Sequence, residues 1–445
     1  MNGNFSNLPL GEKISQIRKA KGYSMENMAH AINKSQAFIS RFENGNAECS
    51  DDELTTIKKF LEIETAPLQE HELKLYRDRI IVCRDLSLSE RYTEAEAILD
   101  ELSIIMELPF EHSLCVMYLM QKAETMLSAG FMKANRENTI AYDDHMETQL
   151  IHVDELLAKA EPLLCNANSE ALYLYHHVLG RVYHYRDENA NALKHYLLAY
   201  NTNCAFSNEY FLLSGIGTSY NFAGKLTKAL VYLELAKANY RGSSADLRWT
   251  HVNHVVAALY LSLGDIPKAI DLLNKNLAQA KSINCEDVVA AVYVRLGYAY
   301  QIMGNYEESI RCFDMVLHDK VIPRRRTGMV YKAHSLRLMK KYDECNELLE
   351  QARALDSDDE DMEIFIDTVS HLMTLNNDES ANYIAEKSIP LICRTYAACD
   401  KWHAIRLCNE LEAHYKKKRT MTKANAIAVV ARDIYKDMYE GDIEF

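Results

Sequence analysis

Basic side chains are concentrated in one short part of an acidic chain. The sequence has 445 residues and a formal net charge of −14 at pH 7. Between positions 8 and 47, six basic side chains stand against three acidic ones, which leaves a local charge of +3. The six are Lys13, Arg18, Lys19, Lys21, Lys34 and Arg41. The total charge argues against general affinity for nucleic acid, whereas a local basic patch is able to contact phosphate.

No set of residues typical of a catalytic centre occurs in the sequence. It has no glycine-rich phosphate loop, no GxSxG and no HExxH. Histidines gather at 176, 177 and 184 and at 251 and 254, but no carboxylate or cysteine completes a metal set at helical spacing. The 11 cysteines include no CxxC pair, which indicates buried thiols in a reducing compartment. We therefore predict no enzyme activity, no metal and no cofactor.

The composition favours an all-α protein. Glycine (15) and proline (7) are scarce, and hydrophobic residues make up 48% of the chain. No run of eighteen apolar residues predicts a transmembrane helix. The first residues lack the basic start and long apolar core of a signal peptide. A soluble cytoplasmic protein is expected.

The basic patch lies within four short predicted helices. The helix 10–21 places Ile14 and Ile17 inward and its basic residues Lys13, Arg18 and Lys21 outward. The second helix, 25–32, begins after a serine suited to capping, and the third lies between Ser35 and Gly45. Asn33 joins them through a tight turn, because asparagine tolerates the left-handed conformation. Residues 51–61 form the fourth helix.

The segment Asn33–Gly45, NKSQAFISRFENG, resembles the recognition helix of the Cro/C1-type (XRE-like) helix-turn-helix of phage repressors and bacterial regulators. The resemblance covers residues 8–63, and in that family the third helix enters the major groove. It implies that Gln36, Ala37, Ser40 and Arg41 face the bases, and that Lys34, Ser35, Asn44 and Asn46 lie near phosphates.

The remainder of the chain repeats a hairpin pattern. Small residues recur at Ala192, Ala229, Ala269, Ser309 and Cys345, at steps of 37, 40, 40 and 36 residues. A second set stands where paired helices must approach: Gly180, Gly217, Ala257, Gly297 and Ala333. The pattern resembles tetratricopeptide repeats. We predict a helix-turn-helix domain over residues 1–66, with a linker at 64–67, and a right-handed α-solenoid over 67–445.

The resemblance to tetratricopeptide repeats implies a polar inner surface. In such folds the first helix of each hairpin lines the concave face. Positions three before, one after and four after each small residue form one stripe at helical spacing. We name it the inner stripe, and its candidate ligand-binding residues are His177, Arg181, His184, Ser214, Thr218, Asn221, His254, Tyr298, Gln301, His334 and Arg337. Asparagine and glutamine both donate and accept hydrogen bonds, and arginine binds carboxylates through two, which suits an extended peptide. The alternative for any single member is a solvated groove residue.

An XRE-like helix-turn-helix followed by such repeats resembles the peptide-pheromone regulators known as RRNPP. The resemblance implies a homodimer joined through the repeats, a palindromic operator in double-stranded DNA, and a short signalling peptide in the concave groove that controls operator binding. An alternative is a helix-turn-helix protein whose repeats are a scaffold for a protein partner. An enzyme such as a peptide-regulated phosphatase resembles the same repeat group, but there a helical bundle usually replaces the DNA domain.

Overall fold

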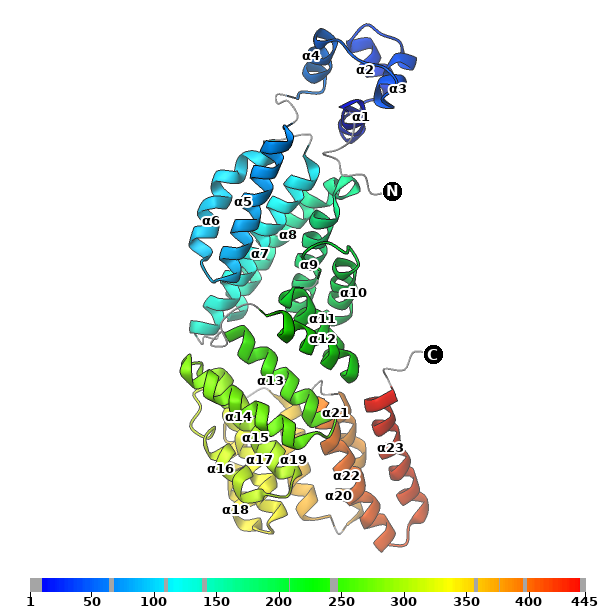
Figure 1. Ribbon diagram of the computed structural model, residues 1–445. Helices are drawn as coiled ribbons and strands as arrows, with labels where there is room; N and C mark the ends of the chain where they lie inside the picture. The colour runs from blue at the N-terminus through cyan, green and yellow to red at the C-terminus, as the bar shows by residue number, and fades with distance from the viewer. Residues whose placement is uncertain are drawn as a thin grey trace. The chain divides into compact units, whose positions relative to one another are not determined.

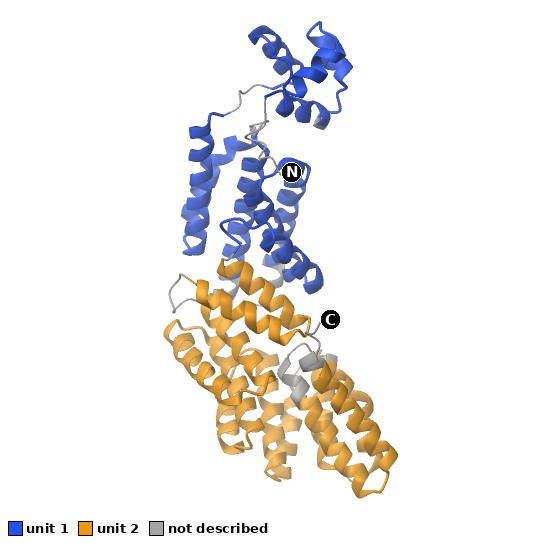
Figure 2. Ribbon diagram, turned by 45° about the vertical axis from the view of Figure 1, so that its right-hand side comes forward, with its two compact units in different colours: residues 1–208 blue, residues 209–445 orange. Residues whose placement is uncertain are grey.

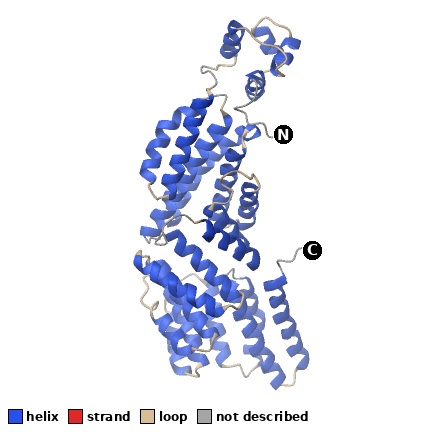
Figure 3. Ribbon diagram, in the orientation of Figure 1, coloured by secondary structure: helices blue, strands red, loops and turns tan. Residues whose placement is uncertain are grey.

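The structure is a computed structural model that describes residues 10–63, 68–107, 111–137, 142–207, 209–240, 247–355, 359–375, 377–394 and 398–440. Every regular element in these ranges is a helix, as Figures 1 and 3 show, which confirms the all-α prediction. No helix within them has the length and apolar character needed to cross a membrane. The predicted linker at 64–67 lies outside the described residues, and the domain boundary stays a prediction.

Four short helices form the N-terminal region, at the predicted positions: α1 (Leu10–Ala20), α2 (Met25–Ala31), α3 (Gln36–Glu43) and α4 (Asp51–Phe60). Local chemistry sets their ends. Ser24 and Ser50 each close a capping box at the start of α2 and α4. Asn33 takes the left-handed conformation with φ 54°, as the turn requires, and Gly45 does so after α3 with φ 73°.

The four helices share one hydrophobic core. Its centre is Ile14, Met28, Ile39 and Ile57, all with 0% exposure. Helix α1 crosses α3 so closely that a Cβ at Gly11 would lie 1.9 Å from the carbonyl oxygen of Phe42. Only glycine permits this crossing, and the inward positions predicted for the isoleucines of α1 are confirmed.

The prediction that Lys13 and Arg18 point outward is wrong. Their exposures are 6% and 5%, whereas Lys21 is exposed as expected. Arg18 follows Ile14 by four residues and therefore shares its face of α1. It is buried because Glu43 of α3 supplies a carboxylate partner there, so the exposed positive charge is smaller than the residue count indicates.

The chain forms two compact units, residues 1–208 and 209–445, coloured separately in Figure 2. After the four N-terminal helices, unit 1 contains α5 (Glu70–Leu88), α6 (Tyr92–Glu101), η2 (Leu102–Glu107), α7 (His112–Glu137), α8 (Tyr142–Ala160), η3 (Glu161–Asn166), α9 (Ser169–Tyr185) and α10 (Asn189–Tyr200). Within this unit α7 packs against α5, α8 and α9.

Unit 2 continues with α11 (Tyr210–Phe222), α12 (Leu226–Asn239), α13 (Leu247–Ser262), α14 (Ile266–Ser282), α15 (Glu286–Ile302), α16 (Tyr306–Asp314), α17 (Ile322–Leu338) and α18 (Tyr342–Arg353). It ends with α19 (Glu360–Met373), α20 (Asp378–Tyr383), η4 (Ile384–Ser388), α21 (Ile389–Arg394), α22 (Ala398–Lys417) and α23 (Met421–Glu440). Successive helices pair as antiparallel hairpins, and α22 packs against both α13 and α23 (Figure 1).

Close helix crossings confirm the predicted hairpins. A Cβ at Gly180 would lie 2.6 Å from the ring of Tyr196, and one at Gly297 would lie 2.5 Å from the ring of Phe313. The small residues of the second helices, Ala192, Ala229, Ala269, Ser309 and Cys345, all have 0% exposure. The small side chains at these positions let the two helices of each hairpin pack closely against each other. Such closely packed helical hairpins are the tetratricopeptide-like arrangement.

Helices α20, η4 and α21 run without a break between Asp378 and Arg394 through a π-helical turn. In this turn the N–H of Ile389 donates to the carbonyl of Ile384, five residues back. Pro390 explains the turn: its ring has no N–H and would collide with a carbonyl of a regular α-helix, and a wider turn relieves that collision. Leu391 and Ile392, which follow the turn, line a pocket together with residues of α19.

Candidate functional site

Helix α3 presents a polar face to solvent. Gln36, Ala37 and Arg41 are exposed and Ser40 is partly exposed. The flanking candidates Lys34, Ser35, Asn44 and Asn46 are also exposed. The opposite face of the helix carries Ile39 and Phe42, which are buried at 0% and 4% exposure. The structure therefore brings all eight predicted DNA-contacting residues to the same short segment, with the base-facing candidates available to a ligand.

Hydrogen bonds at both ends hold α3 in place. Ser35 Oγ accepts from the N–H of Phe38 at 3.2 Å and so caps the first turn. At the other end Asn44 Nδ2 donates to the carbonyl of Ser40 at 2.8 Å. Ser35 and Asn44 thus stabilise the ends of α3, in addition to any contact that they make with phosphate.

A buried ion pair joins α3 to α1. Arg18 donates through Nε and Nη2 to the two carboxylate oxygens of Glu43, at 2.6 and 2.8 Å. Ser15 Oγ donates to the same carboxylate at 2.6 Å, and Arg18 Nη1 reaches the carbonyl of Tyr23 at 2.7 Å. Each charge is thus satisfied by several hydrogen bonds, as a buried pair requires. The sequence indicates this pair only through helical spacing. Arg18 follows Ile14 by four residues and Glu43 follows Ile39 by four, so each charged residue shares a helical face with a core isoleucine.

Lys34 has a partner of its own at the edge of the α3 face. Its Nζ lies 2.7 Å from Glu53 Oε1, and its side chain is 42% exposed. Such a surface pair is worth about 0–1 kcal/mol. A phosphate could replace this carboxylate at small cost in free energy.

In unit 1, His177 and Arg181 of the inner stripe enter a buried charged cluster rather than open solvent. Arg181 pairs with Glu124 of α7, and its other hydrogen bonds reach Ser128 Oγ and Tyr185 OH, both at 2.9 Å. His177 Nδ1 lies 3.6 Å from Glu124 Oε2. Glu124 and Ser128 come from α7, which lies outside the repeat pattern, so the pairing with Glu124 could not be read from the repeats.

His184, at the end of α9, is partly exposed. Its Nδ1 lies 3.2 Å from Asn189 Oδ1 on the neighbouring helix α10. Burial lowers the pKa of this imidazole below its usual value, although the hydrogen bond to Asn189 acts in the opposite direction. His184 is therefore a neutral hydrogen-bonding group near neutral pH.

The α11 segment of the inner stripe is the most accessible part of it in unit 2. Ser214, Thr218 and Asn221 are all partly exposed. Ser214 Oγ donates to the carbonyl of Phe211 at 3.0 Å, which occupies its proton but leaves lone pairs for a donor. Three small polar side chains one helical turn apart are suited to a peptide backbone.

The next three members of the inner stripe are engaged within the repeats. His254 Nε2 accepts from Arg295 Nε at 2.6 Å. Gln301, with 0% exposure, donates to Ser335 Oγ at 2.7 Å and to the carbonyl of Tyr331 at 3.2 Å. Tyr298 has 4% exposure, and its ring packs edge-on against that of Tyr331. In this conformation these side chains stabilise the contacts between successive hairpins.

Helix α22 covers the last members of the inner stripe. Arg337 makes two hydrogen bonds to Glu410, at 2.9 and 3.0 Å. The ring of His334 lies 5.0 Å from that of His403, and both histidines are buried. Sequence reasoning missed Glu410 and His403, because they lie on α22, beyond the last repeat position at Cys345. The inner stripe is therefore closed by the chain itself at α17.

Burial holds several of these histidines neutral. It lowers the pKa of His177 to about 4, although Glu124 nearby acts in the opposite direction. It lowers the pKa of His403 to about 3, and Arg406 and Arg337 add to the effect. A buried imidazolium would lose its hydration, so the neutral ring is favoured.

Acidification is expected to destabilise the fold through these histidines. Their pKa in the folded chain lies below the unfolded value of about 6.5, so the unfolded chain binds more protons between pH 6.5 and 4. The contribution of each such histidine to the free energy of unfolding is fully present above that range. It falls by about 1.4 kcal/mol per pH unit as the pH drops through the range. Urea unfolding at pH 7 and pH 5 measures the slope. His177→Asn should reduce it, whereas His152→Gln, an exposed control, should not. An unchanged slope in His177→Asn would contradict the assignment.

Comparison with known proteins agrees with both halves of this description. Residues 14–68 match the family described as Helix-turn-helix. No curated protein matches the sequence. Among solved structures, the apo form of the quorum sensor NprR from B. thuringiensis is 14% identical, with 81% of this chain and 99% of that chain covered and a TM-score of 0.58. A Rap protein complexed with Competence and Sporulation Factor is 14% identical, with coverages of 83% and 99% and a TM-score of 0.57. NprR in complex with its cognate peptide NprX is 14% identical in sequence, with 81% of this chain and 99% of that chain covered and a TM-score of 0.54.

The chain is thus a DNA-binding helix-turn-helix protein with tetratricopeptide-like helical repeats. Its fold is shared with Rap and NprR. A helix-turn-helix match combined with this fold is the arrangement that the resemblance to RRNPP regulators implies.

Proposed function

We propose that this protein is a cytoplasmic transcriptional regulator, without enzyme activity, that binds a palindromic operator as a homodimer. In this proposal a short signalling peptide in the groove of the repeats controls operator binding, as in quorum sensing. The observation that carries the proposal is the exposed polar face of α3 on a helix whose other face is locked into a core. The shared fold of NprR, which has been solved with a cognate peptide, supports the peptide half.

In the proposed complex α3 lies in the major groove. Gln36 is suited to two hydrogen bonds with adenine, and Arg41 to guanine or a phosphate. Ala37 offers a methyl contact, and Ser40 a hydroxyl. A single domain would bind weakly, because Arg18 is neutralised inside the core and only Lys19, Lys21, Lys34 and Arg41 of the basic set are exposed. Two copies, spaced about one DNA turn apart, would supply the missing affinity.

The peptide would contact the accessible part of the inner stripe. Ser214, Thr218 and Asn221 of α11 are the members available to it, all within unit 2. Arg337, the candidate for a peptide carboxylate, would have to exchange Glu410 for the ligand. The peptide controls DNA binding only to the extent that it binds one arrangement of the repeats more tightly than another. A 100-fold effect needs a coupling free energy of about 2.7 kcal/mol.

The DNA half is tested by selecting binding sites from a random double-stranded DNA library with the full chain. Gel-shift affinity for the selected sequence should fall by about 100-fold in the double variant Gln36→Ala/Arg41→Ala, because both base contacts are lost. Lys59→Ala, which removes an exposed charge from α4, is the matched control. Affinity should also fall steeply with salt. An unchanged affinity in the double variant would reject the DNA interface.

The peptide half uses the same complex. Synthetic peptides from small reading frames beside the gene are titrated into the protein–DNA mixture, and one of them should change the operator affinity. Asn221→Ala should weaken that response while leaving affinity for DNA alone intact, because Asn221 lies on α11, outside the DNA-binding domain. If Asn221→Ala retains the full response, the peptide does not bind at Asn221. The absence of any responding peptide would favour a scaffold for a protein partner.

A further inference from the structure

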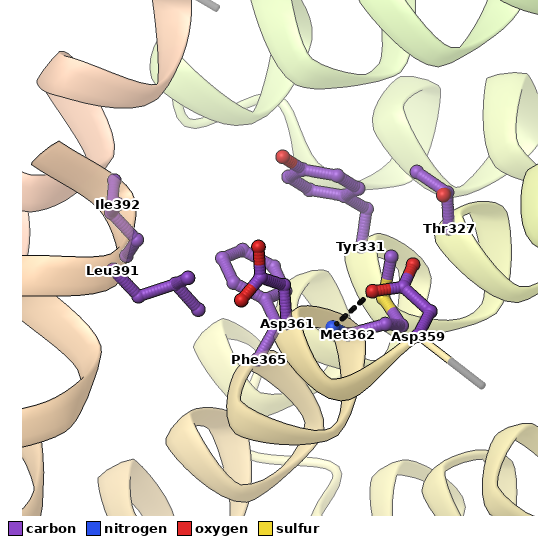
Figure 4. Close-up of a pocket in the computed structure, with 8 residues that line it drawn as sticks. All are labelled: Thr327, Tyr331, Asp359, Asp361, Met362, Phe365, Leu391 and Ile392. Carbon is purple, nitrogen blue, oxygen red and sulfur yellow. Dashed lines mark hydrogen bonds between the residues drawn. The ribbon is translucent and has the colours of Figure 1, made fainter. Parts of the chain in front are cut away.

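A pocket of about 290 Å³ lies between α17, α19 and α21 in unit 2 (Figure 4). Its walls are largely apolar and include Tyr331, Met362, Phe365 and Leu391. Ile392, the hydroxyl-bearing Thr327 and two carboxylates, Asp359 and Asp361, complete the lining. A cavity of this size with apolar walls and a few polar groups is typical of a site for one side chain or a small ligand.

Packing outside the pocket fixes the aromatic wall. The rings of Tyr331 and Phe365 lie 5.3 Å apart, and Tyr331 is stacked on Phe313 at 5.8 Å. Phe313 is itself held against Gly297. On the other side Leu391 of α21 points into the pocket (Figure 4). The cavity is therefore preformed in this structure and needs no rearrangement to accept a ligand.

The two carboxylates have different roles. Asp359 caps α19, because its Oδ1 accepts from the N–H of Met362 at 3.0 Å. Asp361 is exposed, and its side chain forms no ion pair or hydrogen bond among the described residues. It lines the pocket, and in the view of Figure 4 its carboxylate is drawn between Leu391 and Tyr331. The neighbouring Glu363 is already paired with Arg326, so that cation is not available to Asp361.

We infer that this pocket receives a basic side chain, arginine or lysine, of the peptide in the proposed function, on which this inference rests. The methylene stem of such a side chain would lie along Leu391 and Met362. Its charged head would reach Asp361 and the faces of Tyr331 and Phe365, which attract cations. A purely apolar side chain would gain no charge attraction from Asp361, and an acidic one would be repelled. The pocket therefore selects for positive charge as well as for apolar length.

The test uses N-acetyl-arginine N-methylamide and its neutral isostere N-acetyl-citrulline N-methylamide as probes of the full chain. Methyl NMR signals of Met362, Leu391 and Ile392 report occupancy of the pocket directly. The arginine compound should shift all three signals and bind at least about tenfold more tightly than the citrulline compound, because only its head group is charged. Equal affinity of the two compounds, or no shift with arginine, would overturn the inference.

Variants assign the selectivity to one carboxylate. Asp361→Asn should weaken arginine binding by about tenfold, to the level of citrulline. Glu360→Gln, an exposed neighbour in the same helical turn, is the matched control and should bind like the wild type. An equal loss in both variants would show that general negative charge, and not Asp361 in particular, favours arginine, and it would overturn the assignment. Neither DNA nor a signalling peptide enters this measurement, so its failure and a failure of the proposed function are separate results.

Discussion

Glu43→Ala is expected to unfold the helix-turn-helix region of the intact chain. The substitution leaves Arg18 buried without its carboxylate and removes the acceptor of Ser15 as well. Breaking a buried ion pair in this way destabilises by about 3–5 kcal/mol. The 54 residues from 10 to 63 have a total stability of roughly 3–8 kcal/mol by size, so the loss is comparable to the whole. Hydrogen exchange of α1–α4 should show the loss of protection.

Two further variants define the cause. Glu48→Ala removes an exposed carboxylate just before α4 and should leave protection unchanged. Replacing both partners, as in Arg18→Met with Glu43→Leu, should recover much of the loss, because no unpaired charge stays buried. Protection of α1–α4 at the wild-type level in Glu43→Ala would show that the pair does not hold α1 to α3. Loss of DNA binding in Glu43→Ala is thus a consequence of unfolding, unlike that expected for Gln36→Ala/Arg41→Ala.

Arg181→Ala is expected to have the second large effect, on the stability of unit 1. The guanidinium neutralises Glu124, which together with His177 is enclosed between α7 and α9. Interaction with Arg181 holds the pKa of Glu124 below its usual value, although burial acts in the opposite direction. Without Arg181 the buried carboxylate would lose this ion pair, at a cost of about 3–5 kcal/mol. Urea unfolding followed by circular dichroism should show a lower midpoint.

Arg186→Ala is the matched control on the same stretch of chain. Arg186 pairs with Asp154, but both side chains are well exposed, at 38% and 46%. A pair of this kind contributes about 0–1 kcal/mol, so the midpoint should hardly move. If Arg181→Ala destabilises no more than Arg186→Ala, the cluster around Glu124 does not stabilise the unit.

Because Arg181 stabilises unit 1, a variant at this position is a poor test of peptide binding. Loss of peptide binding in Arg181→Ala would mix a missing contact with a weakened fold. Asn221 is the better choice, because it is partly exposed. The same argument applies to Gln301, whose amide joins α15 to α17. The members of the inner stripe therefore divide into residues that hold hairpins together and residues that are available to a ligand.

Local features of this fold were predictable from the sequence. The ends of α2, α3 and α4 follow from serine caps, from Asn33 and from Gly45, each of which acts within a few residues of itself. The hairpin pairing follows from small residues at a regular period, since bulk at Gly180 or Gly297 would collide with the facing ring. The exposed face of α3 follows from helical periodicity alone. In each case the determining interaction is short in sequence or repeats along it.

The sequence by itself therefore determined the helices, their order, the hairpins and the segment that we propose to read DNA. Only the tertiary structure decided which charges are buried and with what partner. Arg18 meets Glu43 across 25 positions, Arg181 meets Glu124 across 57, and Arg337 meets Glu410 across 73. A periodic pattern shows which face a side chain occupies, but the group opposite it belongs to another element brought there by packing. For that reason the inner stripe was visible as a pattern, while its closure by α22 and the pocket beside α19 were not.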